Sequence, residues 1–376
     1  MPHSYEDQIV IVGGGIAGLA LGRVLQAKDI PYRIVERRQN PWDGGLAVNL
    51  PGNAIQALIK LGLGDQIEQI GHPLRRREYR TARDKLLFKV DEDAFWGAAL
   101  HPRSIRRSAL LSMLSEGLPH NRLLYDVDVQ SISENATRTE LVLQNETRLS
   151  AALVVGADGV HSKIRSESFG ASSGSGKALL ADRSWRFMAP NPGVECWTVW
   201  AGADGMMLLM PVGDGEVYGW AALTRPTSHS SSIQALDCLT REFPERARRA
   251  VMQALARPSG LYHSPLEEVR LDCWHKERVV LIGDAAHATA PIWAEGVALA
   301  LEDAIVLGET IATNSNFPAA LSAYESRRRP RVAHVQAMTD AMSRAAKLPP
   351  LVRNLLVPFV GPKQYRQTYE PLKAAI

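Results

Sequence analysis

Apolar runs and a small-residue helical pattern alternate at the start of the chain. Residues 8–12, QIVIV, and residues 31–36, PYRIVE, each carry a run of apolar positions. Between them, residues 13–30 combine glycine, alanine and leucine with helical spacing. A continuous apolar run is typical of a parallel strand that is buried on both faces. The segment is therefore predicted to be a strand–helix–strand unit of roughly 30 residues.

The pattern changes between residues 123 and 155. Short strand-like pieces, LLYDVDVQSI, TRTELVLQ and ETRLSAALVV, are separated by the polar turns ENAT and QNE. This spacing predicts an antiparallel meander. Its last part, LVVG, is fully apolar, so residues 153–156 are predicted to return to the parallel sheet.

The middle of the chain has a third character. Residues 170–177, GASSGSGK, are predicted to be a linker. Strand-like pieces rich in Trp, Met and Val then follow up to about residue 275, together with one helical stretch at residues 233–255. Residues 278–284, RVVLIGD, resume the apolar strand pattern. We therefore expect the chain to leave an α/β domain, build a mostly antiparallel sheet and come back.

Helical patterns fill the remainder of the chain. The tail, LPPLVRNLLVPFVGPKQY at residues 348–365, is interrupted by prolines. It is predicted to be a short packing helix, with attachment to a surface as the less favoured alternative.

Composition argues against several classes of protein but does not indicate a particular activity. Apolar residues make up 45% and charged residues 22% of 376 residues, which is ordinary globular usage. The net charge of +3 is too small to indicate nucleic-acid or membrane binding by itself, and neither a nucleic acid nor stable membrane insertion is expected. The three cysteines are far apart and show no metal-ligand spacing, so free thiols and no metal are expected. With neither a secretory pattern nor an apolar span, a cytoplasmic protein is expected.

A glycine pattern marks the turn after the first strand. Gly13, Gly15 and Gly18 form the spacing G-x-G-x-x-G between an apolar strand and a helix. The first allows a tight turn, the second lets the backbone approach a pyrophosphate, and the third lets helix and strand pack closely. Glu36 ends the second strand, where a carboxylate can accept hydrogen bonds from ribose hydroxyls. Together they predict a dinucleotide site, without separating NAD from FAD.

Two more apolar strands run into acidic turns. VVGADGVHSKIR carries Asp158 and Gly159, and VVLIGDAAHATAP carries Gly283 and Asp284. Taken singly, each aspartate could simply cap the helix that follows. Because ligands of α/β folds bind at the carboxyl ends of the strands, the three turns together favour one shared ligand site.

The three blocks, in this order and spacing, resemble the single-component FAD-dependent monooxygenases, the flavoprotein aromatic hydroxylases. The resemblance spans nearly the whole chain and is strongest at residues 8–60, 103–114, 150–166 and 276–332. It implies a Rossmann-like FAD-binding domain with an inserted, mostly antiparallel β-sheet that binds substrate. It also implies bound FAD and a transient visit by NAD(P)H, since only one glycine fingerprint is present.

The resemblance assigns roles to residues of this chain. Glu36 would hold the adenosine ribose, Asp284 the ribityl chain, and Arg107 in RSALLSML the FAD, with Arg106 as a neighbour in register. The candidate cofactor-binding residues are Gly13, Gly15, Gly18, Glu36, Arg37, Arg107, Asp158, Gly159, Asp284, Gly296 and Val297. The arginines of YESRRRPRV, at residues 324–332, are expected to be structural.

One loop departs from the pattern that the resemblance implies. After Pro291 the family usually has Gly-x-Gly, with backbone amides facing the flavin, whereas this chain has Ala294, Glu295 and Gly296. Glu295 is expected to point away from the flavin and to complement the dipole of the following helix. The alternative is a side chain that serves as an acid or base toward substrate. Pro291, Glu295 and His287 are therefore the candidate catalytic residues, although a structural role for His287 is equally open.

The inserted sheet is expected to supply the substrate wall. Alternation places Leu208 and Met210 on one face of a strand, and Tyr218 and Trp220 on one face of the next. Each could equally be core, but as a set, with Val48, they predict a flat apolar pocket. Residues 75–77, three arginines, are predicted to lie exposed on an edge strand, either solvated or docking NAD(P)H phosphate.

These expectations combine into one functional hypothesis. The chain would use NAD(P)H and O2 to hydroxylate or epoxidise a small aromatic or N-heteroaromatic compound through a flavin hydroperoxide, as a monomer or homodimer. The alternatives are an FAD oxidoreductase or cyclase without oxygen insertion, and a non-catalytic ligand-binding protein. The expected domains are FAD-binding at residues 1–72, 101–177 and 276–345, substrate-binding at 73–100 and 178–275, and a helical tail at 346–376.

Overall fold

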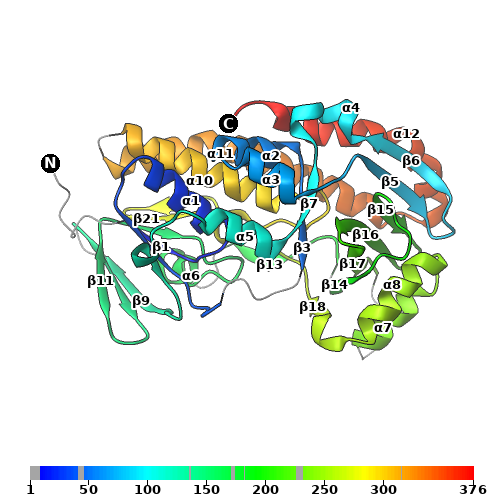
Figure 1. Ribbon diagram of the computed structural model, residues 1–376, viewed down its shortest axis with the longest axis horizontal. Helices are drawn as coiled ribbons and strands as arrows, with labels where there is room; N and C mark the ends of the chain where they lie inside the picture. Colours follow the sequence, from blue (N-terminus) through cyan, green and yellow to red (C-terminus); the bar gives the residue numbers. More distant parts are fainter. Residues whose placement is uncertain are drawn as a thin grey trace.

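A six-stranded, largely parallel sheet forms one half of the molecule (Figure 1). The computed structural model describes residues 9–40, 46–134, 137–170, 174–181, 183–225, 232–314 and 316–376. The strand order is β20 (His275–Lys276), β21 (Val279–Leu281), β12 (Leu153–Gly156), β1 (Ile9–Val12), β2 (Tyr32–Val35) and β8 (Leu123–Leu124). Only β20 runs antiparallel to its neighbour. β1 and β12 are buried at every position, as continuous apolar runs predict.

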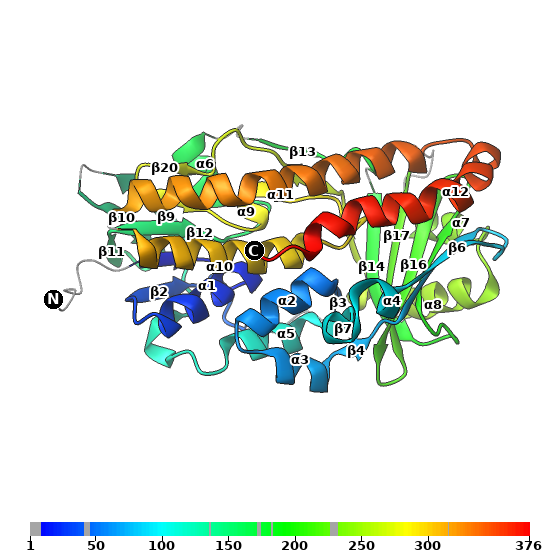
Figure 2. The same ribbon diagram turned by 90° about the horizontal axis from the view of Figure 1, so that it is seen from above.

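Helices cover this sheet and extend beyond it. They are α1 (Ile16–Ala27), α2 (Gly52–Lys60), α3 (Gly64–Ile70), α5 (Arg107–Ser115), α6 (Lys163–Phe169), α9 (Asp284–His287), α10 (Gly296–Thr313) and α11 (Phe317–Ala346). Figure 2 shows α11 running along the molecule, with α10 beside its first half and α12 (Pro350–Tyr369) beside its second half. Helix α1 packs against α10 and α5, so the turn before α1 is held on a rigid support.

A seven-stranded sheet forms the other half. Its order is β18 (Tyr262–Ser264), β14 (Arg183–Pro190), β17 (Glu216–Leu223), β16 (Gly205–Gly213), β15 (Trp197–Ala201), β5 (Arg76–Thr81) and β6 (Leu86–Asp91). All neighbours are antiparallel except β15 and β5. Helices α7 (Ser232–Thr240) and α8 (Glu245–Leu255) cover one face around a separate apolar core, while α12 packs against β6.

Three smaller sheets and several short helices complete the fold of the described residues. The predicted meander is present as a three-stranded sheet of β9 (Val129–Glu134), β10 (Thr139–Leu143) and β11 (Arg148–Ala151). The other small sheets are β3 (Ala47–Leu50) with β7 (Arg103–Arg106) and β4 (His72–Pro73), and β13 (Ser175–Lys177) with β19 (Glu267–Val269). The short helices are α4 (Glu92–Trp96), η1 (Ala98–Leu100), η2 (His120–Arg122), η3 (Pro258–Gly260) and η4 (Glu370–Lys373). The predicted fold class is confirmed, and the predicted domain boundaries stay a prediction.

Three local predictions were wrong. Residues 175–177 of the expected linker form strand β13, while residues 171–173 lie outside the described part of the chain. The expected single helix at 233–255 is two helices, because the chain turns at residues 241–244 and Pro244 becomes the N-cap of α8. The tail helix is not broken: α12 continues through Pro358 and Pro362 over 20 residues.

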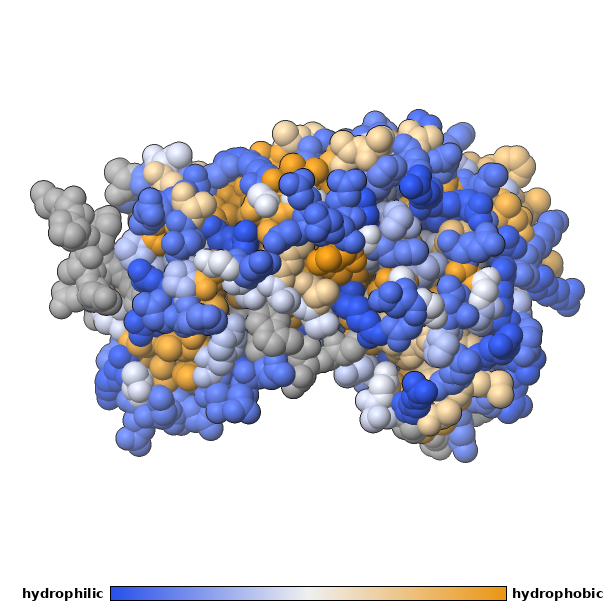
Figure 3. All heavy atoms as spheres, in the orientation of Figure 1, coloured by the Kyte–Doolittle hydropathy of each residue, from blue (hydrophilic) through white to orange (hydrophobic). Residues whose placement is uncertain are grey.

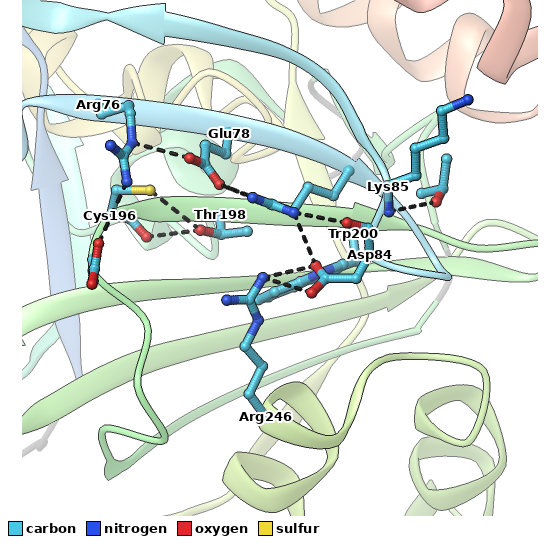
Figure 4. A network of polar contacts seen from close by, with 11 residues as sticks. Arg76, Glu78, Asp84, Lys85, Cys196, Thr198, Trp200 and Arg246 are labelled. Atoms are coloured by element: carbon cyan, nitrogen blue, oxygen red, sulfur yellow. Dashed lines mark hydrogen bonds and ion pairs between the residues drawn. The ribbon is translucent and has the colours of Figure 1, made fainter.

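Helices α7 and α8 are attached to the seven-stranded sheet by polar contacts as well as by the apolar core that they share with it. Asp84, in the β5–β6 turn, accepts hydrogen bonds from Arg246 of α8 at 2.7 Å and from the indole of Trp200 at 2.8 Å (Figure 4). Arg80 joins Asp84 to Glu78 on β5. Burial acts to raise the pKa of Asp84, but the hydrogen bonds from Trp200 and Arg246 and the charges of Arg246 and Arg80 lower it overall. This network therefore holds α8 against the sheet.

Candidate functional site

The glycine turn lies at the carboxyl end of β1, against the neighbouring strand β12. Gly13 has φ +114°, and a Cβ there would overlap the carbonyl oxygen of Ala157. A Cβ at Gly18 would overlap the carbonyl oxygen of Gly13, so α1 approaches the turn closely. At Gly15, in contrast, no atom lies within 4 Å of the position that a Cβ would take. The backbone is therefore open at Gly15, where a pyrophosphate must approach the N-terminus of α1.

Glu36 closes this turn from the second strand. Its carboxylate accepts hydrogen bonds from the backbone N–H of Gly14 at 2.7 Å and of Arg38 at 2.9 Å. The side chain is half-buried, so it is fixed in direction while part of it reaches solvent. Arg37 is exposed. This geometry suits a carboxylate that accepts from sugar hydroxyls beside the glycine turn.

Asp284 marks the other end of the candidate cofactor site. It begins α9, and its Oδ1 atom lies 3.8 Å from the position of a Cβ built on Gly296, the first residue of α10. The side chain is exposed between the buried residues Ile282 and His287. Surrounding protein raises the pKa of Asp284, and the nearby charges of His287 and Arg107 oppose that rise. A carboxylate held in this way is suited to accept from hydroxyl groups of a ligand.

Arg107 connects the two carboxylates. It opens α5, and its backbone N–H donates to the carbonyl of Leu46. Burial lowers the pKa of Arg107, while Glu36 and Asp284 both act to raise it, so the guanidinium lies within electrostatic reach of both ends of the site. Arg106 turns elsewhere and pairs with Glu216. An open glycine turn, two carboxylates and a cation between them fit the pyrophosphate, ribose and ribityl parts of FAD.

Asp158 has local partners in its turn. Its carboxylate accepts from the hydroxyl of Ser162 at 2.5 Å and from the backbone N–H of Lys163 at 2.7 Å and of Ile164 at 3.2 Å. Gly159 has φ +83°, which completes the turn. These bonds are those of a helix cap for α6, which is the structural alternative that the sequence left open. A contact of Asp158 or Gly159 with the cofactor stays a prediction.

The loop before α10 has an unusual backbone. Ala294 has φ +58°, a conformation that glycine adopts without cost and alanine does not. Pro291 is exposed, and Gly296 and Val297 are half-buried at the start of α10. The backbone N–H groups of Gly296 and Val297 thus belong to a helix N-terminus beside Asp284. The methyl group of Ala294 does not prevent the turn, but it leaves backbone strain there.

Glu295 points into the protein interior. It is 2% exposed, and its Oε2 atom accepts a 2.8 Å hydrogen bond from Asn53 of α2. The same Asn53 amide contacts Glu302 at 3.2 Å, and Arg331 pairs with Glu302. Burial raises the pKa of Glu295 to about 8. The side chain therefore occupies a buried polar cluster behind α10. This position is consistent with an orientation away from the flavin. It does not fit an exposed carboxylate that only complements the helix dipole.

His287 belongs to the same buried polar cluster. Its Nε2 atom lies 2.7 Å from Asp303, which also accepts from the N–H of Gly283 at 2.8 Å and from Arg328 at 2.7 Å. His287 is 3% exposed, and its ring packs against Trp274. Although burial acts to raise the pKa of Asp303, His287 and Arg328 lower it to about 2. This arrangement favours the structural role of His287: it holds the turn that presents Asp284.

The predicted substrate wall lies on one face of the large sheet. Leu208 pairs in register with Trp220, and Met210 with Tyr218, so all four share a face. Ala290 and Ile292, in the loop that precedes α10, pack in the same cluster as Trp220 and Leu208. This face therefore packs against the loop that leads into α10. Its contact with substrate stays a prediction. Val48, on β3, is half-buried and packs on the main core.

Arg186 is the charged residue that the sequence did not reveal at this wall. It lies on β14 opposite Trp220, and its guanidinium donates to the hydroxyl of Ser264 at 3.3 Å. Burial raises the pKa of Tyr218 to about 12, and the charge of Arg186 opposes this rise; Arg186 also opposes the raised pKa of Asp284. Arg186 therefore lies within electrostatic reach of both sides of the site. Period-two alternation with Ser184 and Met188 could have placed it on that face.

The prediction for the three arginines at 75–77 holds only in part: Arg75 and Arg76 are exposed, but the edge strand and the exposure of Arg77 were wrong. Strand β5 lies between β15 and β6, so it is not an edge strand. Arg77 is fully buried, pairs with Glu92 and packs over the rings of Trp197 and Tyr369. The arginines at 324–332 are structural, as expected: Arg328 and Arg331 pair with Glu302 inside the protein.

The described residues contain one cluster that could hold a metal, Cys273, His275 and Glu325. Its carboxylate is already engaged: Glu325 accepts from the N–H of Trp274 at 2.9 Å and from His275 at 2.8 Å, and it pairs with Arg329. Because a cation already neutralises Glu325, the cluster is better explained as the attachment of β20 to α11.

Comparison with known proteins agrees with this site. Residues 6–339 match the family described as "FAD binding domain". The chain belongs to this family. FAD is accordingly the cofactor of this protein. That the glycine turn, Glu36, Arg107 and Asp284 hold it stays a prediction.

Relatives in this family include flavin-dependent monooxygenases and hydroxylases. A 2-heptyl-3-hydroxy-4(1H)-quinolone synthase of Pseudomonas aeruginosa is 28% identical over 311 residues, covering 80% of this chain and 79% of the relative. A Klebsiella pneumoniae HpxO structure with FAD and uric acid superposes with TM-score 0.83 at 20% identity, covering 98% and 95%. A 2-methyl-3-hydroxypyridine-5-carboxylic acid oxygenase superposes with TM-score 0.78 at 25% identity, covering 92% and 93%. The predicted resemblance to FAD-dependent monooxygenases is confirmed.

Proposed function

We propose that this protein uses NAD(P)H and O2 to hydroxylate, or epoxidise, a small aromatic or N-heteroaromatic compound. The observation that carries the proposal is the packing of the loop before α10 on the candidate substrate wall, where Ala290 and Ile292 share one apolar cluster with Trp220 and Leu208. This packing supports a wall that faces the start of α10, with Arg186 opposite Trp220 on the neighbouring strand. For hydroxylation, NAD(P)H, a proton, O2 and the aromatic substrate become NAD(P)+, water and the hydroxylated product.

The chain's own residues would bind and orient the reactants. Bound FAD would supply the redox chemistry, namely acceptance of a hydride from NAD(P)H and activation of O2. Asp284 and Glu36 would accept from the hydroxyls of the cofactor, and Arg107 would offset their charge. The N–H groups at the start of α10 are suited to stabilise negative charge that develops at a bound group. Pro291 is proposed to border the space where substrate meets the cofactor.

The substrate wall suggests a planar ring that carries an acidic oxygen. Leu208, Met210 and Trp220 offer apolar surface, while Arg186 offers the positive charge that an enolate, phenolate or carboxylate would need. Tyr218 stays protonated at neutral pH, so its hydroxyl can donate to the same oxygen. Two relatives, a quinolone synthase and a hydroxypyridine carboxylic acid oxygenase, are named after compounds of this class, which supports the proposal.

An isotope experiment tests the proposal. The purified protein, which should be yellow, is incubated under 18O2 with NADH or NADPH and a panel of hydroxylated quinolines, pyridines and purines. We expect oxidation of the nicotinamide that depends on substrate, and one 18O atom in the product. Arg186→Gln should raise the KM for anionic substrates by about 10- to 100-fold, because a charge-assisted hydrogen bond is lost.

Arg241→Gln is the matched control, because Arg241 is an exposed arginine whose partner, at 2.6 Å, is Asp237 of helix α7. It should leave the KM unchanged. Turnover without 18O in any product would replace the proposal by an oxidoreductase or cyclase. Tight binding of a ligand without any turnover would replace it by a ligand-binding protein.

A further inference from the structure

Helix α12 exposes a broad apolar face. Leu351 is 87%, Leu355 69% and Phe359 73% exposed, and their spacing of four residues places them in a row along one side of the helix. We name this surface the α12 apolar face; it consists of Leu351, Val352, Leu355, Leu356, Phe359 and Val360, with Leu348 just before the helix. Figure 3 shows apolar atoms among polar ones along the upper right edge, where Figure 1 places α12. Isolated exposed leucines are common, but a continuous row of this size indicates a binding surface.

Contacts with the rest of the protein hold α12 so that its apolar face points to solvent. On the opposite side of α12, Arg353 donates to the carbonyls of Ala201 at 3.0 Å and Gly202 at 2.7 Å. Further along, a Cβ at Gly361 would overlap the ring of Phe88, so the helix backbone rests directly on β6. Tyr365 donates to Glu92 at 2.5 Å. Since the inner side is held by specific contacts, rotation of α12 cannot bury the apolar face.

The charged residues of α12 itself are all basic. From Ala341 to Tyr369 the sequence contains no Asp or Glu. Arg344 and Lys347 are exposed near one end of the face, and Lys363 and Arg366 near the other. Phe359, Lys363 and Arg366 follow at helical spacing, so the cations extend the apolar row rather than lying behind it. An apolar face flanked by cations at both ends complements a surface that is apolar inside and anionic at its edge.

We propose that the α12 apolar face docks this protein on an anionic lipid membrane, with the helix lying in the plane of the interface. An amphipathic helix with large apolar residues and flanking Lys or Arg binds in this way. At 1.5 Å per residue the 20 residues of α12 extend about 30 Å along the surface. Among the helices in the described ranges, none is both long and apolar enough to cross a membrane. The contact is therefore reversible attachment, not insertion.

A second copy of the chain fits this face less well. A two-fold pairing of α12 helices in antiparallel orientation would bring Arg344 and Lys347 of one copy next to Lys363 and Arg366 of the other. Four like charges would then surround each end of the contact without acidic partners in this segment. A lipid surface with phosphatidylserine or similar headgroups supplies the missing negative charge.

Vesicle flotation with the FAD-loaded protein tests the proposal. We expect the protein to float with vesicles of phosphatidylcholine containing roughly 30% phosphatidylserine, and to bind pure phosphatidylcholine at least about tenfold more weakly. Phe359→Asp and Leu355→Asp should each reduce binding to the anionic vesicles by about tenfold or more. The double variant Lys363→Gln with Arg366→Gln should lose the preference for anionic lipid. Met252→Asp is the matched control, because Met252 is 62% exposed on the distant helix α8; it should bind like the wild type.

Two results would overturn the proposal. One is equal flotation of the wild type, Phe359→Asp and Leu355→Asp proteins. The other is a protein that does not float but sediments as a dimer, and that becomes monomeric on Phe359→Asp substitution, which would assign the face to a second copy. FAD absorbance of each variant confirms that it is folded. Because flotation needs no turnover, failure of this proposal is distinguishable from failure of the proposed reaction.

Discussion

The hydroxyl of Tyr369 donates a 2.5 Å hydrogen bond to the backbone carbonyl of Trp293. The same hydroxyl accepts from Arg77 at 3.1 Å, and the rings of Tyr369 and Trp293 meet edge to face. Tyr369 ends α12, whereas Trp293 lies in the loop that leads into α10. The end of the C-terminal helix thus positions the loop whose following N–H groups lie beside Asp284.

Tyr369→Phe should loosen this loop. The substitution keeps the ring but leaves the carbonyl of Trp293 and a buried donor of Arg77 without their partner, which costs about 1–3 kcal/mol of unfolding free energy. We also expect weaker FAD binding and a changed flavin absorption spectrum, because the start of α10 is less well fixed. Urea unfolding and titration of the apoprotein with FAD measure the two effects.

Tyr365→Phe is the control for this variant. Tyr365 donates to Glu92 in the same buried cluster, but its described contacts do not include the loop at residues 291–295. It should lower stability by a similar amount while leaving FAD affinity and the flavin spectrum unchanged. Equal effects of the two variants on FAD would mean that Tyr369 acts only through general stability.

Asp284→Asn should weaken FAD binding. The charge of Asp284 is lost while its shape is kept, so a charge-assisted hydrogen bond becomes a neutral one. We expect a loss of about 1.5–3 kcal/mol, or roughly 10- to 150-fold in Kd, measured by quenching of FAD fluorescence. Asp65→Asn is the control, because Asp65 is also an exposed aspartate in the first turn of a helix. An unchanged Kd for Asp284→Asn would remove this residue from the cofactor site.

Residues whose role depends on local backbone pattern could be predicted from the sequence. The glycine turn, Glu36 and the strand ends at Asp158 and Asp284 are set by contacts within one strand–turn–helix unit, and apolar periodicity shows such units directly. The shared face of Leu208, Met210, Tyr218 and Trp220 also follows from strand alternation.

Residues whose environment comes from distant segments could not be predicted. In the sequence, Arg77 is one of three arginines that are predicted to be exposed. In the structure it is buried by Glu92 and by aromatic rings of α12, such as Tyr369, which is 292 positions away. The buried partner of Glu295 is Asn53, 242 positions away. Periodicity predicts which face of its element a residue lies on, but not which distant segment covers that face. The buried polar cluster behind α10 was therefore visible only in the structure.

Ala294→Gly should stabilise the protein. Ala294 has φ +58°, where an alanine Cβ meets its own backbone and a glycine does not. Relief of this strain stabilises the folded protein, whereas the greater conformational entropy of glycine stabilises the unfolded chain. The net gain in unfolding free energy is expected to be about 0.5–1 kcal/mol. Ala298→Gly is the control with opposite sign, because Ala298 lies within α10 and glycine there should cost about 1 kcal/mol. Chemical unfolding of both variants with FAD at saturation is the measurement; destabilisation by Ala294→Gly would show that the methyl group contributes packing that outweighs its strain.

Glu295→Gln should remove a pH dependence of stability. Burial raises the pKa of Glu295 from 4.5 to about 8, so the folded protein holds a proton there that the unfolded chain releases at lower pH. The stabilising contribution of the neutral carboxyl is therefore fully present below pH 4.5 and is lost as pH rises through about 8. Glutamine stays neutral, so the variant should be more stable than the wild type at pH 9 and nearly equal to it at pH 5.

The comparison needs an exposed glutamate. Glu370→Gln supplies it, because Glu370 is exposed just after α12, where its partner is the nearby Lys373. Unfolding free energies from urea titrations at several pH values between 5 and 9 should diverge for Glu295→Gln and the wild type, and stay parallel for Glu370→Gln and the wild type. Parallel curves for Glu295→Gln would mean that the carboxylate is ionised in the folded protein at neutral pH. In that case Arg331 and Arg77, whose charges favour ionisation of Glu295, outweigh its burial.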